Sequence, residues 1–249
     1  MFQTTRGLVL REVRYKEADK ILTVLTQSEG KLTLRARGAL RKGSKLAAAT
    51  QLLTFSEMTL FGNRGRWSLN EAATVEQFLG LREDFSALAL GSYFAELLET
   101  LSEEGAPDAA VLQLGLNSLY ALSRGLCGAR QIKAAFELRL MAVTGYAPEL
   151  SGCARCGAPE LARPWFYPPE GAVYCEHCRA AAPGALVPLL PETLAAMRHI
   201  VYSDAKKLFS FTLSDAGLEQ LGDVCEQYLR TQLERGFASL DYWKKVKDT

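Results

Sequence analysis

Four of the six cysteines have the spacing of a metal site. They form two Cys-x2-Cys pairs separated by 18 residues: Cys153, Cys156, Cys175 and Cys178. Each short pair directs two thiolates at one point, and two such pairs complete the tetrahedral sulfur shell that zinc prefers. Zinc is favoured over a mononuclear iron site of similar spacing or two disulfides. Because four sulfurs leave no open position, we expect one Zn²⁺ with a structural role.

The chain between the two pairs predicts how the sulfurs are held together. Residues 163–167 and 172–174 flank a Pro-Pro-Glu-Gly turn, which indicates a β-hairpin. His177 lies inside the second pair, but the sulfur shell is already complete, so this imidazole is expected at the surface or beside the ligands. Cys127 and Cys225 lie outside the motif and are expected to be core or near-core thiols.

Basic residues concentrated in the first part of the chain are the second chemical feature. Residues 1–70 hold 13 Lys and Arg against 5 Asp and Glu, a net charge of +8. The whole chain has 29 Lys and Arg and 28 Asp and Glu. Residues 71–249 therefore hold 16 basic and 23 acidic residues, a net charge of −7. Such an asymmetry is typical of a protein in which one region contacts a polyanion, although a solvated basic face is the alternative.

The pattern of residues 30–37 favours the first of these two interpretations. Leu32, Leu34 and Ala36 alternate with polar and basic residues, so one face of a strand is apolar and the other cationic. Cations on such a face neutralise phosphates while aromatic rings stack on bases, although Trp67 and Phe61 are both more often core residues than stacking platforms. The candidate nucleic-acid contacts are Arg14, Lys16, Lys31, Arg35, Arg37, Arg41, Lys42, Lys45, Arg64, Arg66 and Trp67.

Little in the sequence indicates catalysis. There are only two histidines, and the chain lacks a P-loop, a dinucleotide-binding glycine motif, H-E-x-x-H and G-x-S-x-G. Paired carboxylates of a nuclease remain conceivable among Glu96, Glu99, Glu103 and Glu104, but helical spacing beside an apolar stripe favours a solvated helix face. The expectation is a protein that is not an enzyme.

Two kinds of secondary structure must position these groups. Short β-rich segments are predicted at 6–13, 20–27, 30–37, 53–61 and 65–72. Five strands in so short a stretch predict a closed OB-fold barrel, with a half-open sandwich as the alternative. Helical periodicity begins at Phe85 and continues at 109–124, 129–144, 191–203 and 214–235, with Pro191 at a first helical position and Ser214 as an N-cap.

The predicted fold class is therefore multidomain β plus α, an OB-fold barrel followed by an all-α domain with an inserted zinc ribbon. We expect the nucleic-acid-binding barrel at 1–80, the two parts of the helical domain at 81–150 and 185–249, and the ribbon at 151–184. No apolar run reaches 18 residues and the N-terminal segment lacks the pattern of a signal peptide, so a cytoplasmic protein without a membrane partner is expected.

Several segments resemble a known family. The residues 5–12, 15–26 and 30–41 are similar to the opening of the bacterial RecO family, recombination mediators of the RecF pathway. Residues 93–97, residues 140–148 and the four-cysteine segment that follows also resemble that family. The resemblance runs in order along nearly the whole chain.

This resemblance implies a non-enzymatic DNA repair and recombination mediator. Such a protein binds single- and double-stranded DNA, anneals complementary strands and, with RecR, helps RecA to load onto DNA coated by single-stranded DNA-binding protein. It would be nucleoid-associated during repair. For the acidic tail of single-stranded DNA-binding protein, a cationic rim at Arg130 and Lys133 is expected. The alternatives are a zinc-ribbon nucleic-acid-binding adaptor of transcription or translation, and a metal-dependent nuclease or phosphatase.

Overall fold

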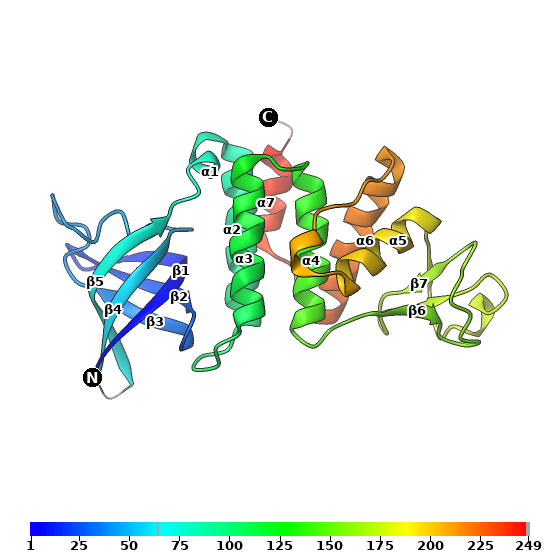
Figure 1. Ribbon diagram of the computed structural model, residues 1–249, viewed down its shortest axis with the longest axis horizontal. Helices are drawn as coiled ribbons and strands as arrows, with labels where there is room; N and C mark the ends of the chain where they lie inside the picture. The colour runs from blue at the N-terminus through cyan, green and yellow to red at the C-terminus, as the bar shows by residue number, and fades with distance from the viewer. Residues whose placement is uncertain (64, 248–249) are drawn as a thin grey trace. The chain divides into compact units, whose positions relative to one another are not determined.

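The computed structural model describes residues 1–63 and 65–247 and divides into two compact units. The first unit comprises Met1–Arg124 together with the chain from Phe237 onward, and the second comprises Gly125–Gly236. Figure 1 shows the barrel strands in blue to cyan and the cysteine-bearing segment in yellow-green. The four-part division expected from the sequence stays a prediction.

A closed five-stranded barrel forms the start of the first unit. Its strands run in the order β1-β2-β3-β5-β4 and are β1 (Phe2–Tyr15), β2 (Asp19–Thr26), β3 (Gly30–Ala36), β4 (Phe55–Asn63) and β5 (Arg66–Glu76). The long β1 pairs with β4 through its first half and with β2 through its second half, and β3 pairs in parallel with β5. These pairings close the OB-like barrel, so the closed form is confirmed over a half-open sandwich.

The barrel core follows the alternation expected for β3. Leu32, Leu34 and Ala36 are buried, whereas Thr33 is exposed. Gly7 allows β1 and β2 to approach closely, because a Cβ atom at this position would lie 2.5 Å from Val24 Cγ1. Because the apolar residues of β3 fill the core, the polar residues that alternate with them lie on the outer face of the barrel.

Four helical segments complete the first unit. They are α1 (Gly80–Glu83), α2 (Phe85–Leu101), α3 (Ala109–Arg124) and α7 (Ala238–Val246). The Ala87 amide donates to Asp84 Oδ1 at 2.9 Å, and this cap sets the start of α2. Helix α7 was not expected from the sequence; it packs beside α2 and buries Leu240 and Trp243 (Figure 1).

The second unit combines helices with a small sheet. Its helices are α4 (Ala129–Val143), α5 (Pro191–Tyr202) and α6 (Asp215–Leu233). Its strands, in sheet order, are β6 (Glu149–Cys153), β8 (Ala172–Tyr174), β7 (Trp165–Tyr167) and β9 (Val187–Pro188). The predicted hairpin is present as the antiparallel pair β7–β8, and the Gly217 amide donates to Ser214 Oγ at 3.1 Å, which confirms the N-cap.

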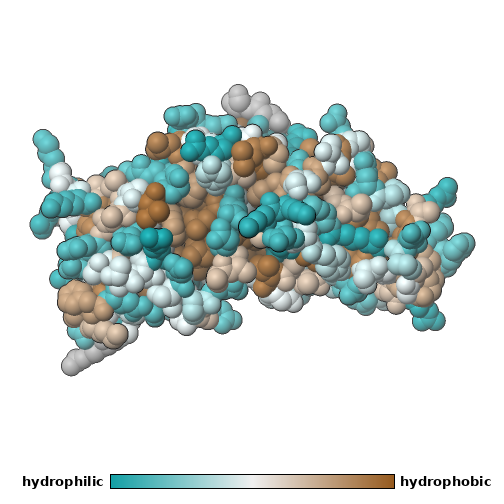
Figure 2. Space-filling view, viewed as in Figure 1, coloured by the Kyte–Doolittle hydropathy of each residue, from teal (hydrophilic) through white to brown (hydrophobic). Residues whose placement is uncertain are grey.

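The surface of the molecule is mostly hydrophilic in the view of Figure 2. A group of apolar side chains lies at the end of the barrel beside the N-terminus, where the exposed apolar residues are Met1, Phe2 and Phe61. Across the described part of the chain, no helix has the length and apolar character needed to cross a membrane.

Candidate metal centre and nucleic-acid interface

The four cysteines of the motif converge on one point in the second unit. The sulfur atoms of Cys153, Cys156, Cys175 and Cys178 all lie within 4.8 Å of one another, and Cys156 Sγ and Cys175 Sγ are 3.9 Å apart. A tetrahedral zinc site with Zn–S bonds of about 2.3 Å has sulfur–sulfur separations of about 3.8 Å. All six cysteines are free thiols, so the disulfide alternative does not match the structure. The donor set fits one tetrahedral metal ion.

Backbone amides hold the sulfur atoms of this cluster. The Cys175 amide donates to Cys153 Sγ at 3.3 Å, and the Gly157 amide closes the first turn onto the Cys153 carbonyl at 2.8 Å. Burial acts to raise the pKa of the Cys153 thiol, but amides of Cys156, Cys175 and Arg155 outweigh it and lower the pKa to about 6. These amides therefore favour the thiolate of Cys153, the form that ligates metal, whereas the hydrogen bond with Cys175 raises the pKa of Cys178 to about 12.

The cations of the cysteine module are partly engaged in its own contacts. Glu176 accepts a hydrogen bond from Trp165 Nε1 at 2.8 Å and pairs with Arg179 at 3.3 Å. The Arg179 guanidinium also lies over the Trp165 ring, 4.6 Å from its centroid. His177 is exposed, in agreement with the expectation that it is not needed as a ligand.

Helices α5 and α6 anchor the cysteine module. Arg198 of α5 donates to the carbonyl oxygens of Leu150 at 2.7 Å and Pro159 at 2.8 Å. On α6, the Tyr228 ring meets Phe166 of β7 edge-on with centroids 5.6 Å apart. These contacts tie the module to helices, so its geometry fits a structural element of the second unit.

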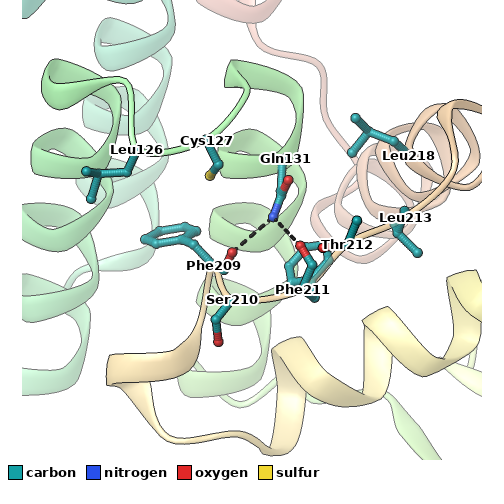
Figure 3. A pocket seen from close by; sticks show the side chains of 9 residues that line it. All are labelled: Leu126, Cys127, Gln131, Phe209, Ser210, Phe211, Thr212, Leu213 and Leu218. Carbon is teal, nitrogen blue, oxygen red and sulfur yellow. Dashed lines mark hydrogen bonds between the residues drawn. The ribbon is translucent and has the colours of Figure 1, made fainter.

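A pocket of about 400 Å³ lies elsewhere in this unit (Figure 3). Gln131 of α4 donates through Nε2 to the carbonyl oxygens of Phe209 and Phe211, each at 3.0 Å, and so holds the segment before α6 against α4. The pocket is lined mainly by apolar side chains, Leu126, Leu213 and Leu218 among them. Cys127 also lines it, and burial raises the pKa of this thiol.

Of the two residues predicted to form a cationic rim in the second unit, one is exposed and the other is buried. Arg130 is exposed, but Lys133 is 4% exposed, contrary to the expectation for a rim residue. The Lys133 ammonium lies 2.9 Å from Glu137 and 3.2 Å from Glu226, and these two carboxylates neutralise it inside the unit. Periodicity could not reveal this burial, because Glu226 comes from α6, far along the chain.

Most of the predicted nucleic-acid contacts in the barrel are exposed. Within the described residues, those that are exposed and form no ion pair are Arg14, Lys16, Arg37, Arg41, Lys42, Lys45 and Arg66. Arg64 lies outside the described residues. The structure thus leaves seven cationic side chains of the barrel region available to solvent.

Lys31 and Arg35 are instead held by contacts within the first unit. Lys31 Nζ donates to the Glu99 carbonyl of α2 at 2.6 Å. Arg35 donates through Nε at 2.8 Å and Nη2 at 2.5 Å to Asp19, and its guanidinium lies 5.2 Å from the Tyr15 ring centroid. Reversing the charge of Arg35 therefore disturbs Asp19 as well as any phosphate contact.

Asp19 organises the start of the basic connection between β3 and β4. Its Oδ1 accepts the Gly38 amide at 2.8 Å while Oδ2 accepts Arg35. The Gly38 amide and the Arg35 guanidinium lower the pKa of this carboxyl below 3.8, and the positive charge of Arg41 adds to the effect. The Asp19 carboxylate thus holds the start of the loop that carries the exposed cations.

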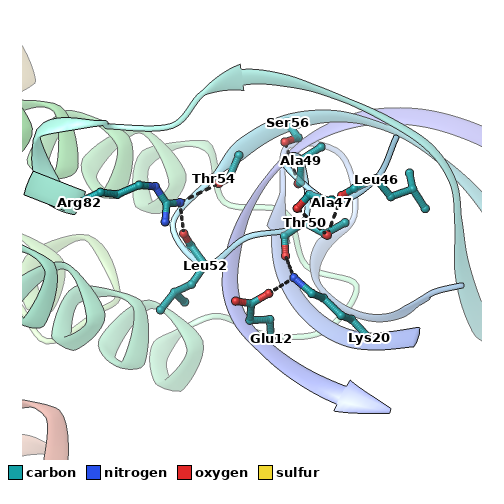
Figure 4. A network of polar contacts seen from close by, with 10 residues as sticks. All are labelled: Glu12, Lys20, Leu46, Ala47, Ala49, Thr50, Leu52, Thr54, Ser56 and Arg82. Carbon is teal, nitrogen blue, oxygen red and sulfur yellow. Dashed lines mark hydrogen bonds and ion pairs between the residues drawn. The ribbon is translucent and has the colours of Figure 1, made fainter. Parts of the chain in front are cut away.

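The far end of the same connection is also anchored (Figure 4). The buried Lys20 ammonium pairs with Glu12 and donates to the Thr50 carbonyl at 3.3 Å. Ser56 Oγ donates to the Ala49 carbonyl at 3.0 Å, and Arg82 Nη2 donates to the Leu52 carbonyl at 3.1 Å. Because both ends are held, the basic residues 41–45 project from a braced connection.

The two aromatic candidates of the barrel, Trp67 and Phe61, differ in exposure. Trp67 is partly buried against the barrel core, as a core residue would be. Phe2, Tyr15 and Phe61 carry exposed rings, and the ring centroids of Phe2 and Phe61 are 5.0 Å apart. Phe2 was not singled out from the sequence; the signal that identifies it is its pairing opposite Phe61 on β4.

Together these features define a class of protein with an OB-like cationic barrel, a helical body and a four-cysteine module. Residues 1–78 match the family model described as recombination protein O N terminal, and residues 82–241 match the model described as recombination protein O C terminal. The two matches cover nearly the whole chain and correspond to the barrel and to the helical part with its cysteine module.

Similar proteins share this assignment. The DNA repair protein RecO of Acetivibrio thermocellus is 35% identical, over 97% of this chain and 96% of its own. The DNA repair protein RecO of Alkaliphilus metalliredigens is 31% identical, over 99% of this chain and 100% of its own. The DNA repair protein RecO of Rubrobacter xylanophilus is 37% identical, over 79% of each chain. The chain belongs to the RecO family of DNA repair proteins, so its role lies in DNA repair and recombination.

Proposed function

We propose that this chain binds single- and double-stranded DNA through its barrel and anneals complementary strands without a catalytic group. The observation that carries the proposal is the row of exposed cations Arg37, Arg41, Lys42 and Lys45, which have no ion-pair partner among the described residues. Arg14, Lys16 and Arg66 extend the same set, and Arg35 contacts Asp19, the carboxylate that holds the start of the loop. Family membership supports a recombination role over that of an adaptor.

The mechanism follows from charge neutralisation. Two DNA strands repel each other through their phosphates, and cations that contact those phosphates displace counterions and lower the repulsion. A surface that holds both strands also raises their effective concentration, which speeds duplex formation. Since no covalent bond changes, annealing needs neither a nucleotide triphosphate nor an acid–base residue. Because phosphate contacts carry no sequence information, binding is expected to tolerate any sequence and to weaken with salt.

The four-cysteine module is proposed to hold one Zn²⁺. Cys153, Cys156, Cys175 and Cys178 supply four thiolates, and such a closed shell stabilises local structure. In this proposal the metal keeps the module folded on α5 and α6, and DNA binding belongs to the barrel.

The partners expected from the family resemblance are RecR and single-stranded DNA-binding protein, with RecA loading as the outcome. For the acidic tail of single-stranded DNA-binding protein we propose the pocket lined by Leu126 and Leu218, whose lining residue Gln131 directly follows Arg130. Lys133 is left out of this proposal because its charge is neutralised by Glu137 and Glu226. The protein is proposed to work in the cytoplasm, at the nucleoid during repair.

The test is annealing of two complementary fluorescent oligonucleotides without nucleotide triphosphate, over increasing salt. The wild-type chain is expected to speed duplex formation, and the acceleration should fade as salt rises. Arg41→Glu with Lys42→Glu should weaken DNA binding by about tenfold or more, because two phosphate contacts become repulsive. The matched control is Lys206→Glu with Lys207→Glu, an equal charge change on exposed residues of the second unit.

The outcomes separate the alternatives. Equal loss of annealing in both double variants would reduce the effect to net charge and refute the barrel assignment. Tighter binding of RNA than of DNA would favour the adaptor function. Shortening of labelled strands when magnesium is added would identify a nuclease, whereas a mediator leaves strand lengths unchanged.

A further inference from the structure

The end of the barrel beside the N-terminus carries an aromatic pair that the cationic surface does not account for. Phe2 is 61% exposed and Phe61 37% exposed, and their rings are tilted by 49° at a centroid distance of 5.0 Å. Phenylalanine side chains are usually buried in a core, and neighbouring apolar side chains that stay exposed often mark a binding surface. They are held in place because Phe2 and Phe61 are directly opposite on β1 and β4, and the Gly62 amide donates to the Met1 carbonyl at 3.0 Å.

A hollow of about 260 Å³ connects this pair to the basic surface. Its lining residues are Phe2, Arg37, Phe61, Ser68, Leu69 and Asn70. Leu69 is buried, so the neighbouring Ser68 and Asn70 occupy the outward positions of β5. Because β3 pairs in parallel with β5 and Ala36 lies opposite Leu69, Arg37 follows next to Asn70.

Asn70 is placed by a break in the strand register. Leu69 pairs with Leu60 and Glu71 pairs with Thr59, so Asn70 is an extra residue of β5 without a partner on β4. A β-bulge of this kind re-aims a side chain and recurs beside functional sites. The result is a short row across the barrel surface with rings at one end, an amide in the middle and a guanidinium at the other end.

We propose that this hollow is a binding site for one unpaired nucleotide, with the base against the Phe2–Phe61 pair and its phosphate at Arg37. This inference rests on the proposed DNA binding and adds a selective element to it. A ring stacks on an unpaired base, whereas bases in a duplex are already stacked on their neighbours. The Asn70 amide offers a donor and an acceptor to a base edge, and Arg37 forms no ion pair with any described residue. The site therefore favours single strands over duplex.

The occupant is a nucleotide and not an apolar peptide for two reasons. Arg37, the first cation of the basic segment 37–45, lines the hollow, and the lining combines aromatic side chains with hydrogen-bonding and cationic groups. On α3, outside the barrel, the Arg124 guanidinium lies 5.5 Å from the centroid of the exposed Tyr120 ring, which makes Tyr120 a matched control.

The test compares affinities for a dT oligonucleotide, a duplex of equal length and an oligonucleotide of abasic sugars. Phe2→Ala with Phe61→Ala should weaken binding of the dT strand about 5- to 100-fold, the range known for loss of base stacking on an aromatic ring. Duplex binding and abasic-strand binding should change less than about twofold, because they rely on phosphate contacts. Phe61→Trp should keep the affinity for dT, and Phe61→Leu should lower it. Tyr120→Ala should match the wild type.

Each other result overturns the inference. Unchanged affinity for dT in the double alanine variant would leave the aromatic pair as a surface for a protein partner. An equal loss for dT and abasic strands would show that no base is stacked. Absence of DNA binding by the wild-type chain, with or without bases, would refute the proposed function together with this site.

Discussion

The barrel and the cysteine module use their cations in different ways. In the module, Arg179 pairs with Glu176 and covers Trp165, and on α5 Arg198 donates to backbone carbonyls of the module. In the barrel region, Arg37, Arg41 and Lys42 remain exposed without an ion pair among the described residues. The cysteine module uses its charges in internal contacts, whereas the barrel region leaves these charges exposed to solvent.

The internal partners of a cation show whether its charge is used within the fold, which the number of basic residues in a segment does not show. Two lysines, Lys31 and Lys133, were both expected at a binding surface. The first donates to a helix carbonyl and the second is neutralised by Glu137 and Glu226. A cation marks a binding surface only when the fold leaves it without an internal partner.

The largest expected effect is loss of the proposed zinc site. Cys153→Ser removes one of the four sulfur atoms that cluster in the described part of the chain. In zinc-finger peptides a structural zinc ion contributes on the order of 10 kcal/mol to folding. We therefore expect the variant to lose its metal and much of the stability of the second unit. Elemental analysis and limited proteolysis of residues 151–184 measure both effects, and Cys127→Ser is the control that should retain zinc. Full metal content in purified Cys153→Ser protein would disprove the ligand assignment.

A smaller loss is expected when the buried cation is removed. Burial acts to lower the pKa of Lys133, but the charges of Glu137 and Glu226 outweigh it and hold the pKa above 10.5. Lys133→Met removes the buried ammonium that both carboxylates contact, which should cost about 3–5 kcal/mol. Chemical denaturation measures the change. The exposed Lys206→Met provides the control, and equal small losses in the two variants would contradict a structural role for Lys133.

The pH dependence of the Lys133 contribution has a definite sign. Because its folded pKa is raised, the stabilisation is fully present below 10.5, the ordinary value, and is lost as the pH rises through the folded pKa. The difference in stability between the wild type and Lys133→Met should therefore be constant near neutral pH and shrink in strong alkali.

The smallest effect is expected at Asp19, the carboxylate that holds the start of the basic loop. Asp19→Asn removes the charge that pairs with Arg35 and weakens the acceptor for the Gly38 amide. Since the folded pKa of Asp19 lies below 3.8, its stabilisation exists above that value and is lost as the pH falls through the folded pKa. Thermal unfolding should show a lower midpoint for Asp19→Asn at pH 7, with the difference closing in acid. A difference in midpoint that stays constant as the pH falls from 7 into the range where the carboxyl is protonated in the folded protein would rule out this role.

Sequence patterns were sufficient for features that depend on neighbours along the chain. The Cys-x2-Cys pairs, the alternation of Leu32, Leu34 and Ala36, and the N-cap at Ser214 are local, because each follows from the geometry of a single turn, strand or helix end. The convergence of the four sulfurs and the five barrel strands were both predicted on this basis and are confirmed.

Features that join distant segments were decided only by the tertiary structure. Phe2 meets Phe61 because the barrel closes between β1 and β4, and Lys133 meets Glu226 because α4 packs on α6. Helix α7 was missed because it is short and its buried Trp243 is stabilised by packing against α2. Local periodicity tells which face of an element is apolar, but strand pairing and helix packing determine which charge is neutralised and which ring is left exposed.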